Sequence, residues 1–114
     1  METLGIGTDI VDMSRFMRAR FPDRIAEYIL IDEEIEAMHK SRNTIQFLAS
    51  RFAAKEAIIK ASPISLTYHN ILIQRDGQKL SAHIITLPQA VPYKLFLSVA
   101  HEFRYTIAYA IVCR

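Results

Sequence analysis

Apolar side chains recur at helical spacing in the middle of the chain. At about 100° per residue, four of them fall within about a sixth of a helix circumference: Ile45, Leu48, Phe52 and Ile59. We therefore expect a long helix whose apolar stripe faces a core. Ser41 or Asn43 is placed to cap its start, and Pro63 disfavours helical geometry in Ser62, so the helix is expected to end there.

Alternating apolar and polar residues predict a strand near the N-terminus, at residues 4–11 (L-G-I-G-T-D-I-V). One face carries three apolar side chains: Leu4, Ile6 and Ile10. The other face carries Asp9 together with Gly5 and Gly7, which lack side chains. Glycine weakens a strand interior and is tolerated where a ligand or another backbone approaches closely. Two alternatives follow, namely open space for a ligand beside Asp9, or a bulge or tight packing.

The second half of the chain has the composition of antiparallel strands. Two segments flank the turn-forming pair Asp76-Gly77 and predict a hairpin: residues 71–74 and 79–85. Two further segments are rich in aromatic and β-branched residues and are expected to pair across a short turn: residues 93–100 and 105–112. The predicted fold is α+β, a single small domain over residues 1–114 with an N-terminal strand, helices and a C-terminal antiparallel sheet.

Charged residues lie at the border of the apolar stripe on the predicted helix. Lys55 flanks the stripe on one side and Glu56 on the other, and Lys60 lies one turn beyond Glu56. A carboxylate beside a buried stripe needs a cation or a metal ion to offset a desolvation cost of several kcal/mol. Alternatively, Glu56 and Lys60 form an ordinary i,i+4 pair on a solvated helix, worth roughly 0.2–0.5 kcal/mol.

Composition and charge argue against several classes of protein. A hydrophobic content of 51% excludes disorder, and a net charge of +2 falls short of the basic bias of many nucleic-acid binders. No apolar run approaches the ~20 residues that cross a bilayer, and the start lacks the basic region of a secretory signal, so we expect a cytoplasmic protein. Cys113 is the single cysteine and is expected to fill the last strand as a small apolar residue.

Arginines gather near the N-terminus, where four of them occur within ten residues: Arg15, Arg18, Arg20 and Arg24. Ser14 is placed to cap a short helix that Pro22 ends or interrupts. Farther along, Asp32 is a predicted N-cap of another short helix. The arginine cluster suits a transient encounter with an acidic protein, although exposed arginines are also common on solvated surface.

Two stretches together resemble one family. Residues 5–15 read G-I-G-T-D-I-V-D-M-S-R and residues 52–60 read F-A-A-K-E-A-I-I-K. In this order, and in a chain of this length, they resemble holo-acyl-carrier-protein synthase, the short single-domain type of 4'-phosphopantetheinyl transferase. A third stretch at residues 97–112 (L-S-V-A-H-E-F-R-Y-T-I-A-Y-A-I-V) is similar to the closing strands of that family.

The resemblance implies a reaction and a set of catalytic residues. Asp9 and Glu56 would bind Mg²⁺, since two carboxylates with waters and substrate phosphates make a typical site for this ion. The metal would hold the diphosphate of coenzyme A while a serine of apo acyl carrier protein attacks the β-phosphorus, giving holo carrier protein and 3',5'-ADP. Lys60 is the expected phosphate contact, and Lys55 either shares that role or holds Glu56 in place.

The resemblance also implies partners. His101 matches a histidine near the nucleotide, and Arg15, with Arg18 beside it, is expected to bind the carrier protein. The family forms trimers whose active sites lie between neighbouring subunits. In such a trimer Asp9 and Glu56 would come from one chain, and a nucleotide contact such as His101 from the next.

The chain departs from the family pattern in two places. Residues 61–65 (A-S-P-I-S) replace a glycine-containing loop that wraps the diphosphate, and Ala100 and Glu102 replace side chains expected to donate hydrogen bonds. Two other classes of function therefore stay open. One is a non-catalytic module that binds carrier protein; the other is a nucleic-acid-binding domain, favoured by the spacing of Tyr105 and Tyr109 on one strand face.

Overall fold

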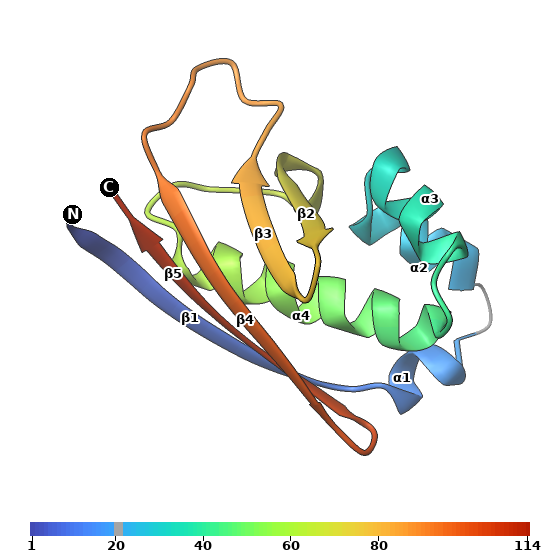
Figure 1. Cartoon of the computed structure of the whole chain (residues 1–114). Coiled ribbons are helices and arrows are strands. Elements are labelled where there is room, and N and C mark those ends of the chain that lie inside the picture. Colours follow the sequence, from blue (N-terminus) through green and yellow to red (C-terminus); the bar gives the residue numbers. More distant parts are fainter. Residues whose placement is uncertain (20–21) are drawn as a thin grey trace.

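The structure is a computed structural model that describes residues 1–19 and 22–114. Arg20, part of the predicted arginine cluster, lies outside the described residues. The elements follow one another in the order drawn in Figure 1: β1 (Thr3–Asp12), α1 (Ser14–Met17), α2 (Pro22–Ile29), α3 (Asp32–His39), α4 (Thr44–Ala61), the 3₁₀ turn η1 (Tyr68–Asn70), β2 (Ile71–Asp76), β3 (Lys79–Ile84), β4 (Lys94–Glu102) and β5 (Tyr105–Cys113). The predicted α+β class is confirmed.

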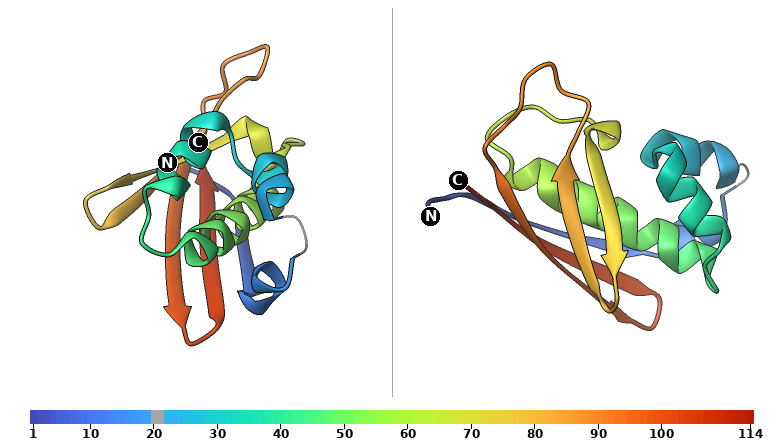
Figure 2. Two further views of the ribbon diagram at one scale, coloured as in Figure 1. Left: turned by 90° about the vertical axis from the view of Figure 1, so that its right-hand side faces the viewer. Right: turned by 45° about the horizontal axis from the view of Figure 1, so that its top comes forward.

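Two antiparallel sheets are arranged around α4. The larger sheet has the strand order β1-β5-β4, and α4 lies across one of its faces, mainly over β1 and β5. The smaller sheet is the predicted β2–β3 hairpin, which stands beside β4 without joining its ladder. Figure 2 shows α2 and α3 gathered at the end of α4 that is far from both chain termini. Strands β2 and β3, like strands β4 and β5, are joined by a short turn, whereas β1 pairs with β5 from the other end of the chain.

The glycines of β1 allow α4 to approach the sheet closely. A Cβ atom on Gly7 would lie 1.9 Å from the carbonyl oxygen of Ala57, and one on Gly5 would lie 1.9 Å from that of Ala61. No side chain fits at either position, because the atom in the way belongs to the helix backbone. Of the two alternatives, tight packing is thus correct, and the prediction of open space for a ligand beside these glycines is wrong.

Small side chains make up most of the buried surface of α4. Its alanines at four successive core positions are fully buried: Ala49, Ala53, Ala54 and Ala57. Of the predicted apolar stripe, Leu48 is buried, whereas Ile45, Phe52 and Ile59 are only partly buried against the core. The stripe does face the core, but the sheet contacts the alanine side of the helix, which the choice of large apolar residues did not reveal.

Several local predictions are confirmed and three need correction. The first is Ser14, which is the first residue of α1 and not its cap: the N-cap is Met13, with no side-chain cap hydrogen bond. Asn43 caps α4 by accepting a hydrogen bond from the backbone N–H of Gln46, and the helix ends before Ser62. The N-cap of α3 is Ile31 and not Asp32, because the Glu34 carboxylate accepts the Ile31 N–H at 2.9 Å.

A further correction concerns Pro22: it was expected to end or interrupt the first short helix, but it begins α2. Its fixed φ suits the first helical position, where its missing N–H costs nothing. Cys113 is buried in β5, as expected. Among the described helices, none combines the length and the apolar character needed to span a membrane.

Candidate active site

The structure brings together Asp9 from β1 and Lys60 from the last turn of α4. Lys60 Nζ lies 3.1 Å from Asp9 Oδ1 and donates to the backbone oxygen of Thr8 at the same distance. The Asp9 side chain is 16% exposed and that of Lys60 53% exposed, so the pair lies at the rim of the β1–α4 interface. The close approach at the two glycines places this end of α4 within reach of the β1 carboxylate.

Glu56 lies one turn before Lys60 and accepts a hydrogen bond from the Tyr68 hydroxyl at Oε1. Burial raises the pKa of Tyr68 above its ordinary value, and the negative charges of Glu56 and, more weakly, Asp9 raise it further. The structure thus joins Asp9 to Lys60 and places Glu56 one helical turn before Lys60 on α4. The approach of Asp9 and Glu56 to each other stays a prediction.

The donor set fits Mg²⁺. These contacts use Oδ1 of Asp9 and Oε1 of Glu56, which leaves the second oxygen of each carboxylate for a ligand. Within the described residues, no three His, Cys, Asp or Glu side chains form a metal-binding group. Mg²⁺ is usually bound through one or two carboxylates, with waters and substrate phosphates completing its shell, so two oxygen ligands at a partly exposed rim suit it.

Lys55 does not reach this site, which corrects its prediction as a cofactor ligand. Its side chain is fully buried, and Nζ donates to Glu34 Oε1 at 2.6 Å. It also donates to the backbone oxygens of Ile29 at 2.9 Å and Tyr68 at 3.0 Å. An ammonium group has three N–H donors, so all three are used inside the protein. Lys55 ties α4 to its neighbours and has no donor left for a phosphate.

His101 lies on the far edge of the sheet from Asp9. It is on β4, Asp9 is on β1, and β5 runs between them. Neighbouring strands are about 4.8 Å apart, so the two residues are separated by about 10 Å or more. Its Nδ1 hydrogen-bonds Thr106 Oγ1 at 2.9 Å, and burial, helped by the charge of Arg75, lowers its pKa. A single chain does not bring His101 and Asp9 together.

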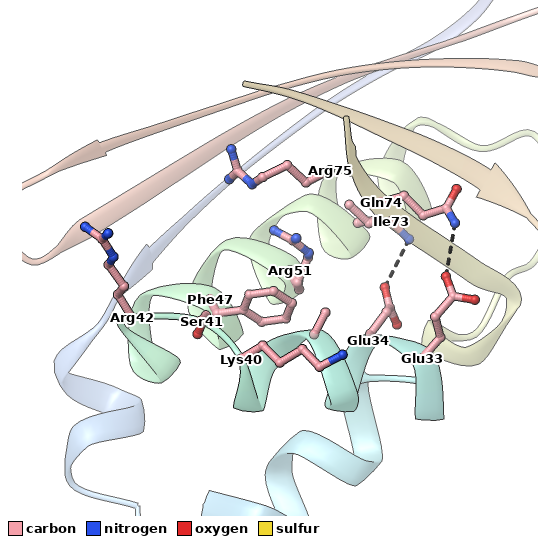
Figure 3. Close-up of a pocket in the computed structure, with 11 residues that line it drawn as sticks. Glu33, Glu34, Lys40, Ser41, Arg42, Phe47, Arg51, Ile73, Gln74 and Arg75 are labelled. Atoms are coloured by element: carbon pink, nitrogen blue, oxygen red, sulfur yellow. Dashed lines mark hydrogen bonds between the residues drawn. The ribbon is translucent and has the colours of Figure 1, made fainter. Parts of the chain in front are cut away.

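A basic cavity of about 700 Å³ opens between α3, α4 and β2 (Figure 3). Arg51 extends into it from α4, only 3% exposed, and stacks on the Phe47 ring at 4.1 Å. Its Nε has no hydrogen-bond partner among the described residues. Burial, reinforced by the charge of Arg75, lowers the pKa of Arg51 to about 10. Arg75 lines this cavity together with Arg51, and it also lines a neighbouring cavity together with His101, so the two arginines and the histidine lie in adjoining parts of the surface.

Of the predicted carrier-binding arginines, Arg15 lies on α1 and Arg18 is the C-cap that follows it. The Arg15 guanidinium is 5.8 Å from the centre of the Phe52 ring, and that ring is 5.9 Å from the ring of Tyr68. Arg18 is exposed and donates to Ser14 Oγ at 3.3 Å. One aromatic row therefore separates the arginines from Glu56.

The altered loop does not form a backbone cradle for a phosphate. Ser62 Oγ bonds the N–H and the carbonyl of Ile64, closing a tight turn. In the described part of the chain, positive φ angles occur only at Gly77, Thr86 and Phe103, far from this loop along the chain. The effect of this departure on coenzyme A binding stays a prediction. No motif pointed to Tyr68, which lies outside the three stretches that carry the resemblance.

Comparison with known proteins agrees with this geometry. The family model described as the 4'-phosphopantetheinyl transferase superfamily matches residues 5–110. The chain belongs to this superfamily. Curated relatives are named holo-[acyl-carrier-protein] synthase: the protein of Vibrio cholerae is 35% identical over 97% of this chain and 98% of its own length, and that of Azoarcus sp. 36% identical over 95% of each.

Solved structures of such synthases have the same fold. The enzyme of Neisseria meningitidis superposes with a TM-score of 0.83 at 28% identity, covering 98% of this chain and 99% of the other. That of Bacillus anthracis, in complex with coenzyme A (3',5'-ADP), also gives 0.83 at 24% identity, covering 98% and 97%. The chain is thus an enzyme of the holo-acyl-carrier-protein synthase class of phosphopantetheinyl transferases, and the predicted family is confirmed.

Proposed function

We propose that this protein transfers 4'-phosphopantetheine from coenzyme A to a serine of apo acyl carrier protein in a Mg²⁺-dependent reaction that releases 3',5'-ADP. The observation that carries the proposal is the contact of Asp9 on β1 with Lys60 on α4, one helical turn after Glu56. The names of the curated relatives support the same reaction. The expected place of action is the cytoplasm.

The residues of the site have separate tasks in this proposal. Asp9 and Glu56 hold the metal ion through their second carboxylate oxygens. When bound, Mg²⁺ neutralises charge on the diphosphate and on the leaving phosphate. Lys60 is the remaining cation at the site, and its half-exposed ammonium can leave Asp9 to contact a phosphate oxygen as a point charge. Together these groups favour the charge that develops in phosphoryl transfer.

The nucleotide end of coenzyme A requires a second subunit. His101, Arg51 and Arg75 lie on the opposite side of α4 from Asp9, so within one chain they cannot contact a substrate held there. We assign these side chains to the nucleotide end of coenzyme A bound at a neighbouring subunit, with Arg51 and Arg75 as the cations and His101 as a neutral hydrogen-bonding group. The active site would then lie between copies of the chain, in the trimer that the family resemblance implies.

The outer face of the large sheet provides a surface for this assembly. It points away from α4 and exposes six large apolar side chains: Ile6, Ile10, Phe96, Tyr105, Ile107 and Tyr109. Monomeric proteins rarely leave such a contiguous patch in water. On this face, Ile6, Thr8 and Ile10 each lie in a row of paired residues that runs across β1, β5 and β4. None of these three rows contains a lysine or an arginine. That composition fits a second copy of the chain and disfavours nucleic acid, which requires a basic stripe.

Subunit complementation tests the shared site. Glu56→Gln and His101→Ala proteins are each expected to transfer poorly. A mixture dissociated and reassembled together should regain part of the activity, because some interfaces then combine an intact Glu56 with an intact His101. No recovery in assembled hybrids would place all the groups of one site on one chain.

A non-catalytic carrier-binding module is the second candidate, favoured by one specific observation. The turn at residues 61–65 lacks a backbone cradle, and Glu102 adds a negative charge near the proposed nucleotide site. Such a protein would bind carrier protein through Arg15 and Arg18 without modifying it.

One experiment separates the candidates. The protein is incubated with apo acyl carrier protein, coenzyme A and Mg²⁺, and the carrier is weighed by intact mass spectrometry. Gain of the phosphopantetheine mass, abolished by EDTA and restored by Mg²⁺, supports the enzyme. Carrier binding without a mass gain supports the module, and salt-sensitive binding to nucleic acid without carrier would overturn both.

A further inference from the structure

Tyr68 belongs to neither sequence motif, yet its hydroxyl is bonded to a predicted metal ligand. The phenol donates to Oε1 of Glu56 from η1, a turn that follows the altered loop. We propose that Tyr68 is a positioning residue that fixes the Glu56 carboxylate so that its second oxygen is presented to the metal ion. This inference rests on the proposed function, because it concerns the same carboxylate site.

The backbone of Tyr68 is held by the buried network around Lys55. The Tyr68 carbonyl accepts a hydrogen bond from Lys55 Nζ at 3.0 Å, and the same ammonium is paired with the buried Glu34 at 2.6 Å. Glu34 in turn accepts the N–H of Ile73 through its other oxygen at 3.0 Å. The backbone at Tyr68 is thus connected to α3, α4 and β2 at once, so the start of η1 cannot shift without breaking a buried ion pair.

The ring of Tyr68 is held by aromatic neighbours on two sides. Tyr28 packs against it edge-on, with centroids 5.6 Å apart, and Phe52 lies 5.9 Å away at a tilt of 48°. Such contacts restrict rotation of the ring about its side-chain bonds. The ring contacts therefore restrict the hydroxyl, and the more flexible partner in the hydrogen bond is Glu56, whose half-buried side chain has more rotatable bonds.

A hydrogen bond of this kind has a known effect on metal sites. Carboxylates that bind a metal are commonly held by a second hydrogen bond, and its loss weakens metal binding by about 10–100-fold. A protonated phenol donates one hydrogen bond and leaves the other carboxylate oxygen to a cation. If instead the phenol competed with the metal for Glu56, its removal would strengthen metal binding, so the two cases predict changes of opposite sign.

The test compares Tyr68→Phe with Tyr28→Phe. Both changes remove one hydroxyl and keep the ring, but only the first removes the bond to Glu56. Mn²⁺ serves as the probe and is titrated by electron paramagnetic resonance into the assembled protein without coenzyme A. We expect Tyr68→Phe to raise the Mn²⁺ dissociation constant about 10–100-fold and Tyr28→Phe to leave it unchanged.

Kinetics and unfolding give a second readout. The Mg²⁺ concentration for half-maximal transfer should rise in Tyr68→Phe by the same factor, while KM for apo carrier protein stays the same. Thermal unfolding should change little, because the ring contacts remain. A Tyr68→Phe protein that unfolds as early as Lys55→Met would overturn the assignment, since the hydroxyl would then act in the fold and not at Glu56.

The remaining outcomes are equally decisive. Unchanged or tighter Mn²⁺ binding in Tyr68→Phe, with normal binding in the unaltered protein, would overturn the positioning role and leave the proposed function standing. Absence of Mn²⁺ binding in the unaltered protein would overturn both.

Discussion

Lys55 and Glu56 are neighbours in the sequence but lie in opposite environments. Lys55 is fully buried, and its three N–H donors are paired with Glu34, Ile29 and Tyr68. Glu56 lies about 100° around the helix, half-buried and bonded to Tyr68, one turn before the Lys60 that contacts Asp9. One charged residue of the motif stabilises the helix in its place, and the next is available for chemistry.

The difference shows how a short motif can combine a structural and a chemical role. A buried ammonium is tolerated only when it is fully paired, so Lys55 fixes the position of α4 relative to α3 and η1. Because α4 is fixed in this way, the neighbouring Glu56 has a defined position while its own side chain is only half-buried. Each prediction below changes one side of this comparison and leaves the other intact.

The largest effect on stability is expected from Lys55→Met. Removing the ammonium leaves the Glu34 carboxylate buried without its cation, which typically costs about 3–5 kcal/mol of unfolding free energy. The matched control is Lys40→Met, which breaks the exposed i,i+4 pair with Glu36 and should cost at most about 0.5 kcal/mol. Urea unfolding of both variants measures the difference. Equal losses would show that Lys55 has no special structural role.

Gly7→Ala is expected to have the next largest effect. The new methyl group would meet the Ala57 carbonyl at 1.9 Å, so α4 must move away from β1. Overpacking of this kind costs about 1–3 kcal/mol or more. Displacement of Glu56 from Asp9 by about 1 Å would also lower the transfer rate about 100-fold.

The control for this change is Gly77→Ala, at φ 64° in the β2–β3 turn with no atom near the new methyl group. Backbone strain there costs about 1 kcal/mol, and the transfer rate should not change. If Gly7→Ala behaves like Gly77→Ala in both stability and rate, close packing does not set the geometry of the site.

Charge reversal on α1 should affect the partner and not the chemistry. In the Arg15→Glu, Arg18→Glu double variant we expect KM for apo carrier protein to rise about tenfold or more at low salt, with kcat little changed, because rim charges act mainly on association. Arg114→Glu is the control, since Arg114 lies at the end of the chain and pairs with Glu2. Steady-state kinetics at two salt concentrations measure the effect. A fall in kcat with constant KM would place Arg15 and Arg18 in the reaction itself.

The smallest effect concerns pH and His101. Burial lowers its pKa in the folded protein below the ordinary value of 6.5. Below pH 6.5 the unfolded chain therefore binds a proton that the folded chain does not, so this contribution to stability is present above pH 6.5 and is lost as pH falls toward the folded pKa. His101→Gln should show a shallower loss of stability between pH 7 and pH 5, measured by thermal unfolding. An identical pH profile in both proteins would contradict the assignment.

Much of the fold was predictable because its signals are local. Asp76-Gly77 marks a tight turn, and Asn43 and Pro63 mark the ends of α4. Alternation alone did not predict which face of β1 packs against α4. The apolar face with Ile6 and Ile10 is exposed in the single chain, and the face with the glycines is buried. Alternation identifies two faces but does not say which one meets a helix.

The candidate site residues were predictable where they belong to the two motifs that carry the family resemblance. Asp9 and Lys60 are in contact, and Glu56 lies one helical turn before Lys60; their roles in a metal site stay a prediction. Lys55 and Tyr68 were not resolved, because their roles depend on contacts with Glu34 and Glu56 that are 21 and 12 residues away in sequence. Spacing along one helix gives the direction of a side chain but not the element that covers it.

The most direct test asks whether both carboxylates are needed for transfer. Apo carrier protein, coenzyme A and Mg²⁺ are incubated with the unaltered protein, Asp9→Asn or Glu56→Gln, and the mass of the carrier is followed over time. We expect the unaltered protein to add phosphopantetheine and each variant to be slower by about 1,000-fold or more, the equivalent of several kcal/mol of transition-state stabilisation, while both variants unfold at nearly the same urea concentration as the unaltered protein. Near-normal turnover by a folded Glu56→Gln protein would contradict the account.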